Sequence, residues 1–327
     1  MSSRLFGKKK EKETSEERFF LKNGAAVLEQ LISSLNGDCN PIRNYSAHQL
    51  KTATNSYHHE LMLQEEAYYK LYKGNHEDRE IAVKIFIYKR RLENIANEAA
   101  IASRMSSHNN VLKLLGCCLE TEWPILVYEY PKMGNLLDCL NRTDLDVPLT
   151  LELRLRIAMK VANAVAYLHH GLSKKFIHRD INPRTIFLDQ NFEPKLFDFQ
   201  WALSIPEGEN HVQVDSLMGI LGFIAPEGFS NFRYSEKSDV FAFGSLFSEI
   251  LTKKRISNIV QDKILAGKPF ERASAVKKFV EAILLHEENR AQVMEATKLI
   301  EACHKFDPDD RPDMIEVAKA LRLIINS

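Results

Sequence analysis

Acidic and basic side chains that could handle a proton, a metal ion or a phosphate recur at defined spacings in this chain. Lys84 lies in a β-type run, and Glu98 follows 14 residues later on an alanine-rich helical segment. Asp198 lies 18 residues after Asp180, and Glu227 lies 29 residues after Asp198. The motifs that hold them are Ala82-Val83-Lys84-Ile85, His178-Arg179-Asp180-Ile181, Asp198-Phe199-Gln200 and Ala225-Pro226-Glu227. Each motif alone could arise by chance, but their order and spacing together are specific.

From about residue 61 to the end, this series of motifs resembles a protein kinase. The resemblance implies that Lys84, held by Glu98, contacts the α- and β-phosphates of ATP. It also implies that Asp180 is at the place of the catalytic base and Asp198 at that of the Mg²⁺ ligand. A structural alternative stays open for Lys84, namely a strand lysine that pairs with a helix glutamate and keeps the small lobe closed.

Residues that support the large lobe of a kinase are also present. By the same resemblance, Asp239 in Ser238-Asp239-Val240 braces the catalytic loop, and Arg311 in Asp310-Arg311-Pro312 pairs with Glu227. Because these residues make no contact with nucleotide in the family, their presence indicates a conserved scaffold and says nothing of catalysis.

The phosphate-binding loop departs from the kinase pattern. Counting back from Gly74, its three glycine positions hold Gln64, Glu66 and Tyr69. Glycine there lets backbone N–H groups approach the phosphates closely, so three side chains obstruct that approach. Glu65 and Glu66 also place carboxylates where a triphosphate would lie, unless they point to solvent.

The catalytic and metal-binding segments depart as well. Asn182 stands where the family has a lysine that neutralises the transferring phosphate, and Thr185 replaces an asparagine that binds the second Mg²⁺. A threonine hydroxyl is a poor substitute for that amide oxygen. Gln200 replaces the glycine of Asp-Phe-Gly, and Ile220 replaces a threonine that bonds the catalytic aspartate. Because several electrostatic contacts are missing together, ATP and Mg²⁺ are expected to bind weakly and catalysis to be nearly lost.

The elements that must position these residues change in character along the chain. Residues 1–18 are charge-dense and predict a mobile tail, and residues 19–60 predict a helical extension with apolar residues at helical spacing from Phe19 to Leu35. Residues 61–130 are rich in strands, with a helix over Asn94–Met105, and residues 131–327 are mainly helical. The prediction is an α+β, two-lobe kinase-like fold with a β-rich small lobe and a helical large lobe.

Composition limits the classes of partner. Lys and Arg together number 44, as do Asp and Glu, so the formal net charge is zero and nucleic-acid binding is not expected. The five cysteines, without a signal-peptide pattern, predict reduced thiols in a cytoplasmic protein. No apolar run reaches the ~18 residues of a membrane span. Lys8-Lys9-Lys10 allows peripheral contact with the inner face of the plasma membrane, although following glutamates favour a solvated tail.

The histidine pairs His58-His59 and His169-His170 are predicted to be surface or helix-end residues. In the sequence, no group of His, Cys and Asp has the spacing of zinc ligands.

A second set of motifs narrows the family. Leu115-Gly116-Cys117-Cys118 resembles plant receptor-like cytoplasmic kinases, and the N-terminal region is similar to the ZED-one-related (ZRK) pseudokinases. The segments that carry this likeness are Asn23-Gly24-Ala25, Leu31-Ile32, Asn36-Gly37 and Asn40-Pro41-Ile42-Arg43. The resemblance implies an adaptor in plant immunity that links a coiled-coil NLR receptor to a receptor-like cytoplasmic kinase modified by a pathogen effector. The alternatives are a weak ATP-dependent serine/threonine kinase and an allosteric activator of an active kinase.

Overall fold

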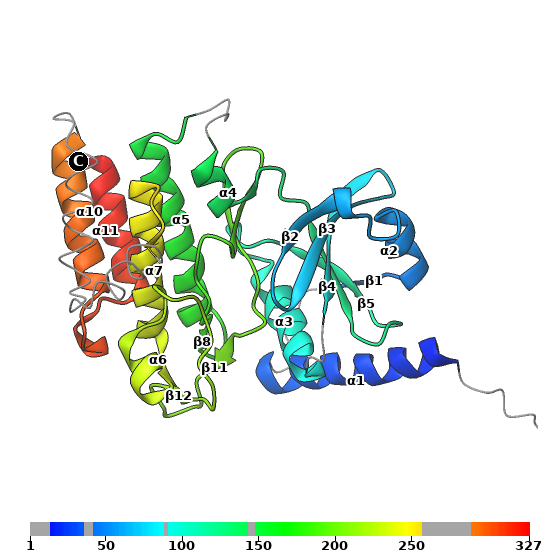
Figure 1. Cartoon of the computed structure of the whole chain (residues 1–327). Helices are drawn as coiled ribbons and strands as arrows, with labels where there is room; N and C mark the ends of the chain where they lie inside the picture. Colours follow the sequence, from blue (N-terminus) through cyan, green and yellow to red (C-terminus); the bar gives the residue numbers. More distant parts are fainter. Residues whose placement is uncertain (1–13, 36–41, 88–90, 143–147, 257–288) are drawn as a thin grey trace, which may run out of the picture.

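In a computed structural model, which describes residues 14–35, 42–87, 91–142, 148–256 and 289–327, the chain forms two lobes (Figure 1). The β-sheet of the small lobe lies on the right of the view and the helices of the large lobe on the left. The predicted α+β, two-lobe architecture is therefore confirmed. The lysine run at residues 8–10 and Cys39 lie outside the described residues.

The small lobe is built on a six-stranded sheet in the order β1-β5-β6-β4-β3-β2. Its strands are β1 Arg43–Asn44, β2 Met62–Glu65, β3 Tyr69–His76, β4 Arg79–Phe86, β5 Leu114–Cys118 and β6 Ile125–Glu129. Successive residues of a strand face opposite sides, and accordingly Cys117 packs in the main core while Cys118 packs in a second core. That second core includes Leu50 of helix α2 (Ala47–Ala53), so α2 covers one face of the sheet.

The N-terminal segment is part of the small lobe and not only a helical addition to it. Helix α1 (Ser15–Leu35) lies alongside α3 (Leu92–Met105), and β1 adds a parallel edge strand to β5 (Figure 1). The helix begins four residues before the predicted Phe19. The reason is a cap in which the Thr14 hydroxyl accepts from the Glu17 N–H and the Glu17 carboxylate accepts from the Thr14 N–H.

The large lobe is assembled around α5 (Leu151–His170) and the almost wholly buried α7 (Glu236–Thr252). Among the described residues, its other helices are α4 Leu136–Asn141, α6 Pro226–Asn231, α10 Arg290–Cys303, η3 Pro308–Asp310 and α11 Met314–Asn326, with η1 His59–Leu61 in the small lobe. Its short strands are β7 Gly134–Asn135, β8 Phe176–Ile177, β9 Ile186–Leu188, β10 Pro194–Leu196, β11 Leu203–Ser204, β12 Val212–Gln213 and β13 Arg233–Tyr234. The loops between β8 and β11 bring Asp180 and Asp198 to the face that meets the small lobe.

Candidate nucleotide site

Lys84 lies at the centre of a buried charge cluster between the lobes. Its ammonium donates to both Glu98 oxygens, at 2.7 and 2.8 Å, and to Asp198 Oδ1 at 2.8 Å. Lys84 and Glu98 are fully buried, and the Tyr128 hydroxyl donates a further bond to Glu98 Oε1 at 2.8 Å. The Tyr69 ring, 4.1 Å from the Lys84 nitrogen, covers the ammonium. Since an ammonium has three N–H groups, all of them are engaged inside the protein and none is directed at a phosphate.

Both oxygens of Asp198 also accept hydrogen bonds from the chain itself. Its Oδ1 accepts from Lys84, and its Oδ2 accepts from the Gln200 amide at 2.9 Å. Gln200 is 5% exposed, so this bond is shielded from water. A Mg²⁺ ion at Oδ2 of Asp198 would compete with the Gln200 amide, a contact that the usual glycine at this place could not make.

The degenerate phosphate loop is held down by polar side chains. The Gln64 amide donates to the Tyr69 hydroxyl at 2.9 Å and contacts Glu66 Oε1 at 3.1 Å and the Arg184 carbonyl at 3.3 Å. Its oxygen accepts from Asn135 at 3.0 Å. Gln64 and Tyr69 are buried, at 6% and 1% exposure. The loop is thus tied to the large lobe at the level where glycines would leave room for phosphates.

The two glutamates of this loop have different surroundings. Glu66 reaches across to the large lobe and forms an ion pair with Arg184, with 2.9 Å between Oε1 and the guanidinium. Glu65 instead pairs with Lys70 on the next strand, with its side chain half exposed. Of these two glutamates, only Glu66 therefore places its carboxylate in the cleft. The contribution of Arg184 could not be expected from the sequence, where it lies two residues beyond the missing lysine.

The catalytic loop is closed on itself. The Asn182 amide donates to Asp180 Oδ1 at 2.9 Å and to the Asp180 carbonyl at 3.0 Å. The Thr185 hydroxyl lies 2.8 Å from the same carbonyl and 3.0 Å from that of Asn182. Thr185 is 2% exposed and its oxygen faces the backbone of its own loop. Neither residue supplies the cation or the metal ligand that the kinase pattern has at these positions.

The space that remains between the lobes is a cleft of about 310 Å³. Glu66, Asp180 and Asp198 line it, with Arg184 as the basic residue of the described lining. Two like unit charges 4 Å apart repel by about 4 kcal/mol at an effective dielectric of about 20, so a triphosphate would be opposed by these carboxylates. The residues present do not fit a Mg²⁺–ATP complex.

Asp180 gives the cleft a pH dependence that can be measured. Burial raises the pKa of Asp180 to about 7, repulsion from Asp198 acts in the same direction, and the bond from Asn182 opposes both. Because the folded pKa lies above the unfolded one, the folded chain binds more protons between about pH 4 and 7, and its stability falls as the pH rises through that window. Urea unfolding should show that Asp180→Asn reduces the loss between pH 5 and pH 8 by about 1–2 kcal/mol, allowing for solvent at the partly exposed carboxyl.

The exposed Asp215 supplies the matched control, since Asp215→Asn should leave the pH profile as in the unaltered chain. An Asp180→Asn profile as steep as that of the unaltered protein would contradict the assignment.

The scaffold contacts predicted for the large lobe are present. Asp239 accepts from the backbone N–H groups of His178, at 2.7 Å, and Arg179, at 2.9 Å. These bonds hold Arg179 at φ +70°, which sets the direction of the loop that carries Asp180. Arg311 pairs with Glu227 through two bonds of 2.8 and 2.9 Å. The interpretation of Asp239 and Arg311 as structural residues thus agrees with their geometry.

His169 is at the end of α5, as predicted, but it does not lie on the surface. It is 1% exposed, and its Nε2 is 2.9 Å from Asp239 Oδ2. The side chain is buried there because α5 packs against α7, which carries Asp239.

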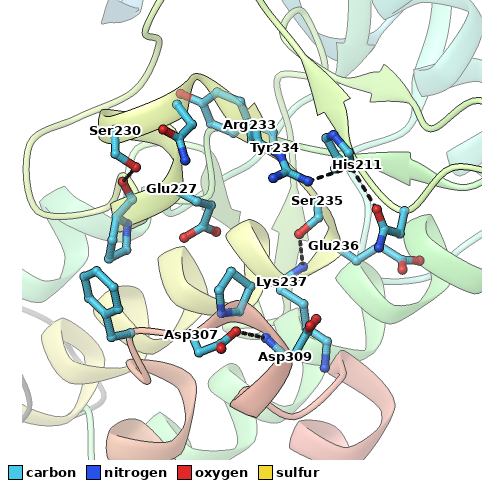
Figure 2. Close-up of a pocket in the computed structure, with 15 residues that line it drawn as sticks. His211, Glu227, Ser230, Arg233, Tyr234, Ser235, Glu236, Lys237, Asp307 and Asp309 are labelled. Atoms are coloured by element: carbon cyan, nitrogen blue, oxygen red, sulfur yellow. Dashed lines mark hydrogen bonds between the residues drawn. The ribbon is translucent and has the colours of Figure 1, made fainter.

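A second cavity, of about 490 Å³, lies on the large lobe between α6, the start of α7 and residues 306–309 (Figure 2). Glu227 lies in its wall, and Figure 2 shows Arg233 beside His211 at the opposite side. Phe306, also in the wall, is 82% exposed. The cavity shares no described lining residue with the nucleotide cleft, and of its described lining residues Pro226 and Glu227 belong to the kinase motifs.

Residues 62–321 match the family of protein tyrosine and serine/threonine kinases. The chain therefore belongs to the protein kinase family. It is 36% identical to the non-functional pseudokinase ZRK2 of Arabidopsis thaliana, over 97% of this chain and 92% of that protein. It is 34% identical to the serine/threonine-protein kinase ZRK1 (97% and 95% covered) and 33% identical to the non-functional pseudokinase ZED1 (94% and 96% covered), both of the same organism. The resemblance to ZRK-type proteins is confirmed.

Among the helices that the structure describes, none has both the length and the apolar composition required to cross a bilayer.

Proposed function

We propose that this chain is a catalytically impaired kinase-like protein that acts as an adaptor in plant immunity. It links a coiled-coil NLR receptor to a receptor-like cytoplasmic kinase that a pathogen effector has modified, in the cytoplasm or at the inner face of the plasma membrane. The observation that carries the proposal is that Lys84 and Gln200 of the chain itself donate to Oδ1 and Oδ2 of Asp198, the position of the Mg²⁺ ligand. Two relatives of similar length bear the name of non-functional pseudokinase, which supports it.

Helix α1 offers a surface for the receptor. Its inner face is attached to the small lobe, where buried Asn23 donates to the carbonyls of Leu119 and Thr121. Its outer face exposes an apolar stripe at helical spacing: Leu21, Leu28 and Ile32 are 63%, 57% and 58% exposed. A cluster of exposed apolar side chains on one helix face is typical of an interaction site. The partner kinase is assigned to the activation segment, Phe199 to Pro226, which adjoins the cavity of Figure 2.

The proposal is tested by co-precipitating the full chain with a coiled-coil NLR from plant tissue. Asp180→Asn should retain the receptor, because adaptor function needs no phosphoryl transfer. Leu28→Glu should reduce recovery at least about tenfold, since a charge enters the apolar stripe. Leu323→Glu is the matched control, because Leu323 is 72% exposed on α11, far from α1. Loss of the receptor in folded Asp180→Asn, or full recovery with Leu28→Glu and Ile32→Glu combined, would contradict the proposal.

A weak serine/threonine kinase is the second candidate. The observation that favours it is the Lys84–Glu98 pair, formed as an active kinase requires, and one relative is named a serine/threonine-protein kinase. Incubation with radiolabelled ATP and Mg²⁺ separates the candidates. Phosphate incorporation that disappears in Asp180→Asn would establish the kinase, whereas no incorporation and no thermal shift with ATP support the adaptor.

A further inference from the structure

The end of α5 and the start of α7 bring together three side chains that the kinase motifs do not use. His169 and His170 are the last residues of α5, and Glu236 is the first residue of α7. His169 Nδ1 and Glu236 Oε1 are buried atoms without a hydrogen-bond partner among the described residues. Orphaned polar atoms are costly in a protein interior, so two at one place require an explanation.

The tautomer of the His169 ring follows from the contact that its Nε2 makes. Nε2 lies 2.9 Å from Asp239 Oδ2, and a carboxylate only accepts, so Nε2 carries the hydrogen and donates it. Asp239 is held as the carboxylate by the further N–H bonds of His178 and Arg179. In the neutral ring, Nδ1 of His169 then carries a lone pair that no described residue occupies. A histidine that donates one N–H to a carboxylate and offers the other nitrogen is the usual arrangement of a metal ligand.

We propose that His169, His170 and Glu236 form a binding site for Zn²⁺. One ligand atom from each, His Nδ1 or Nε2 and a carboxylate oxygen, lies within 4.8 Å of the others, and His170 Nδ1 is 3.9 Å from Glu236 Oε1. Two ligands of a tetrahedral zinc ion lie roughly 3.4 Å apart, given bonds of about 2.0–2.1 Å. The three ligand atoms must therefore move slightly closer together to bind the ion. The exposed His170 ring can turn to do so, while His169 is fixed by Asp239.

The ligand chemistry selects the ion. Two imidazole nitrogens and one carboxylate suit Zn²⁺, whereas Mg²⁺ prefers oxygen ligands in octahedral geometry. Lys175 lies 3.5 Å from the other oxygen of Glu236, so it contacts the carboxylate from outside the site. Three protein ligands leave a fourth position on the solvent side for water or for a partner's side chain.

Bound zinc would join α5 to α7 next to Asp239, which holds the backbone of the catalytic loop. Zinc binding would therefore stabilise the position of the catalytic loop in the absence of nucleotide. This inference does not depend on the adaptor proposal, because it concerns residues outside both the nucleotide cleft and α1.

The experiment is titration of ZnCl₂ into the full chain, after removal of any affinity tag and treatment with EDTA, by calorimetry and by thermal unfolding. The unaltered chain should bind one equivalent, and a hundredfold excess of Zn²⁺ over Kd should raise Tm by about 4 °C. MgCl₂ should leave Tm unchanged. His170→Ala and Glu236→Gln, which alter an exposed and a partly exposed side chain, should each weaken Zn²⁺ binding at least about tenfold.

The pair His58-His59 supplies the matched control. These are also adjacent histidines near a glutamate, with His58 3.8 Å from Glu60, but on the small lobe. His59→Ala should bind Zn²⁺ as the unaltered chain does. Absence of stoichiometric binding, or equal affinity in His170→Ala and the unaltered chain, would overturn the assignment, the first indicating a buried water and the second a different site.

Discussion

Lys84→Met is expected to lower the free energy of unfolding by about 3–5 kcal/mol. The lysine is the cation between two carboxylates, Glu98 and Asp198, and all three side chains lie within the protein. Removing it leaves those carboxylates buried and opposed, and the penalty for an uncompensated buried charge exceeds that of losing a surface pair. Urea unfolding monitored by tryptophan fluorescence measures the change.

Two variants make the interpretation specific. Lys73→Met is the control, because Lys73 pairs with Glu80 across the neighbouring strand with about a third of its side chain exposed, and a surface pair contributes about 0–1 kcal/mol. Adding Glu98→Gln to Lys84→Met should restore part of the stability by removing one negative charge. A loss below about 1 kcal/mol for Lys84→Met would show that the cluster is not an energetic centre of the fold.

Arg311→Lys is expected to cost about 3 kcal/mol, although it conserves the charge. All five N–H groups of Arg311 are bonded: two to Glu227, and one each to the carbonyls of Lys237, Lys305 and Phe306. An ammonium has three donors and cannot form the planar two-bond pair with a carboxylate. Some of these carbonyls and one oxygen of Glu227 would lose their partner.

The comparison for this variant is Arg322→Lys, where the arginine is exposed on α11 and the substitution should change stability by less than about 0.5 kcal/mol. If Arg311→Lys unfolds at the same urea concentration as Arg322→Lys, the role assigned to the five bonds is incorrect.

Both variants are expected to lose stability because, in this kinase scaffold, charged side chains at kinase motif positions stabilise the fold. Lys84, Glu98 and Asp198 keep the positions of catalytic residues, but their bonding capacity is used within the protein. Gln200 completes that use at Asp198. A side chain that is hydrogen-bonded within the protein in this way can bind ATP only if one of these internal hydrogen bonds is broken.

Much of this architecture could be predicted from local patterns. The β-type run that holds Lys84 corresponds to β4, and the predicted helix over Asn94–Met105 corresponds to α3, which begins two residues earlier. Their ends depend on neighbours in the chain, as at Thr14, where a capping box extends α1 beyond the predicted start. The large-lobe pair of Arg311 and Glu227 followed from motifs whose order in the family is known.

Residue types alone identified the kinase scaffold and showed which of its functional groups are missing. These are the glycines replaced by Gln64, Glu66 and Tyr69 and the lysine replaced by Asn182. Only the tertiary structure shows which partners the replacing side chains contact. Gln64 meets Asn135 and Glu66 meets Arg184 across 71 and 118 residues of sequence, and His169 meets Asp239 across 70. Such contacts arise from how the lobes close and how α5 packs on α7. A spacing along the chain specifies only which element carries a side chain, whereas the packing of elements specifies which groups it meets.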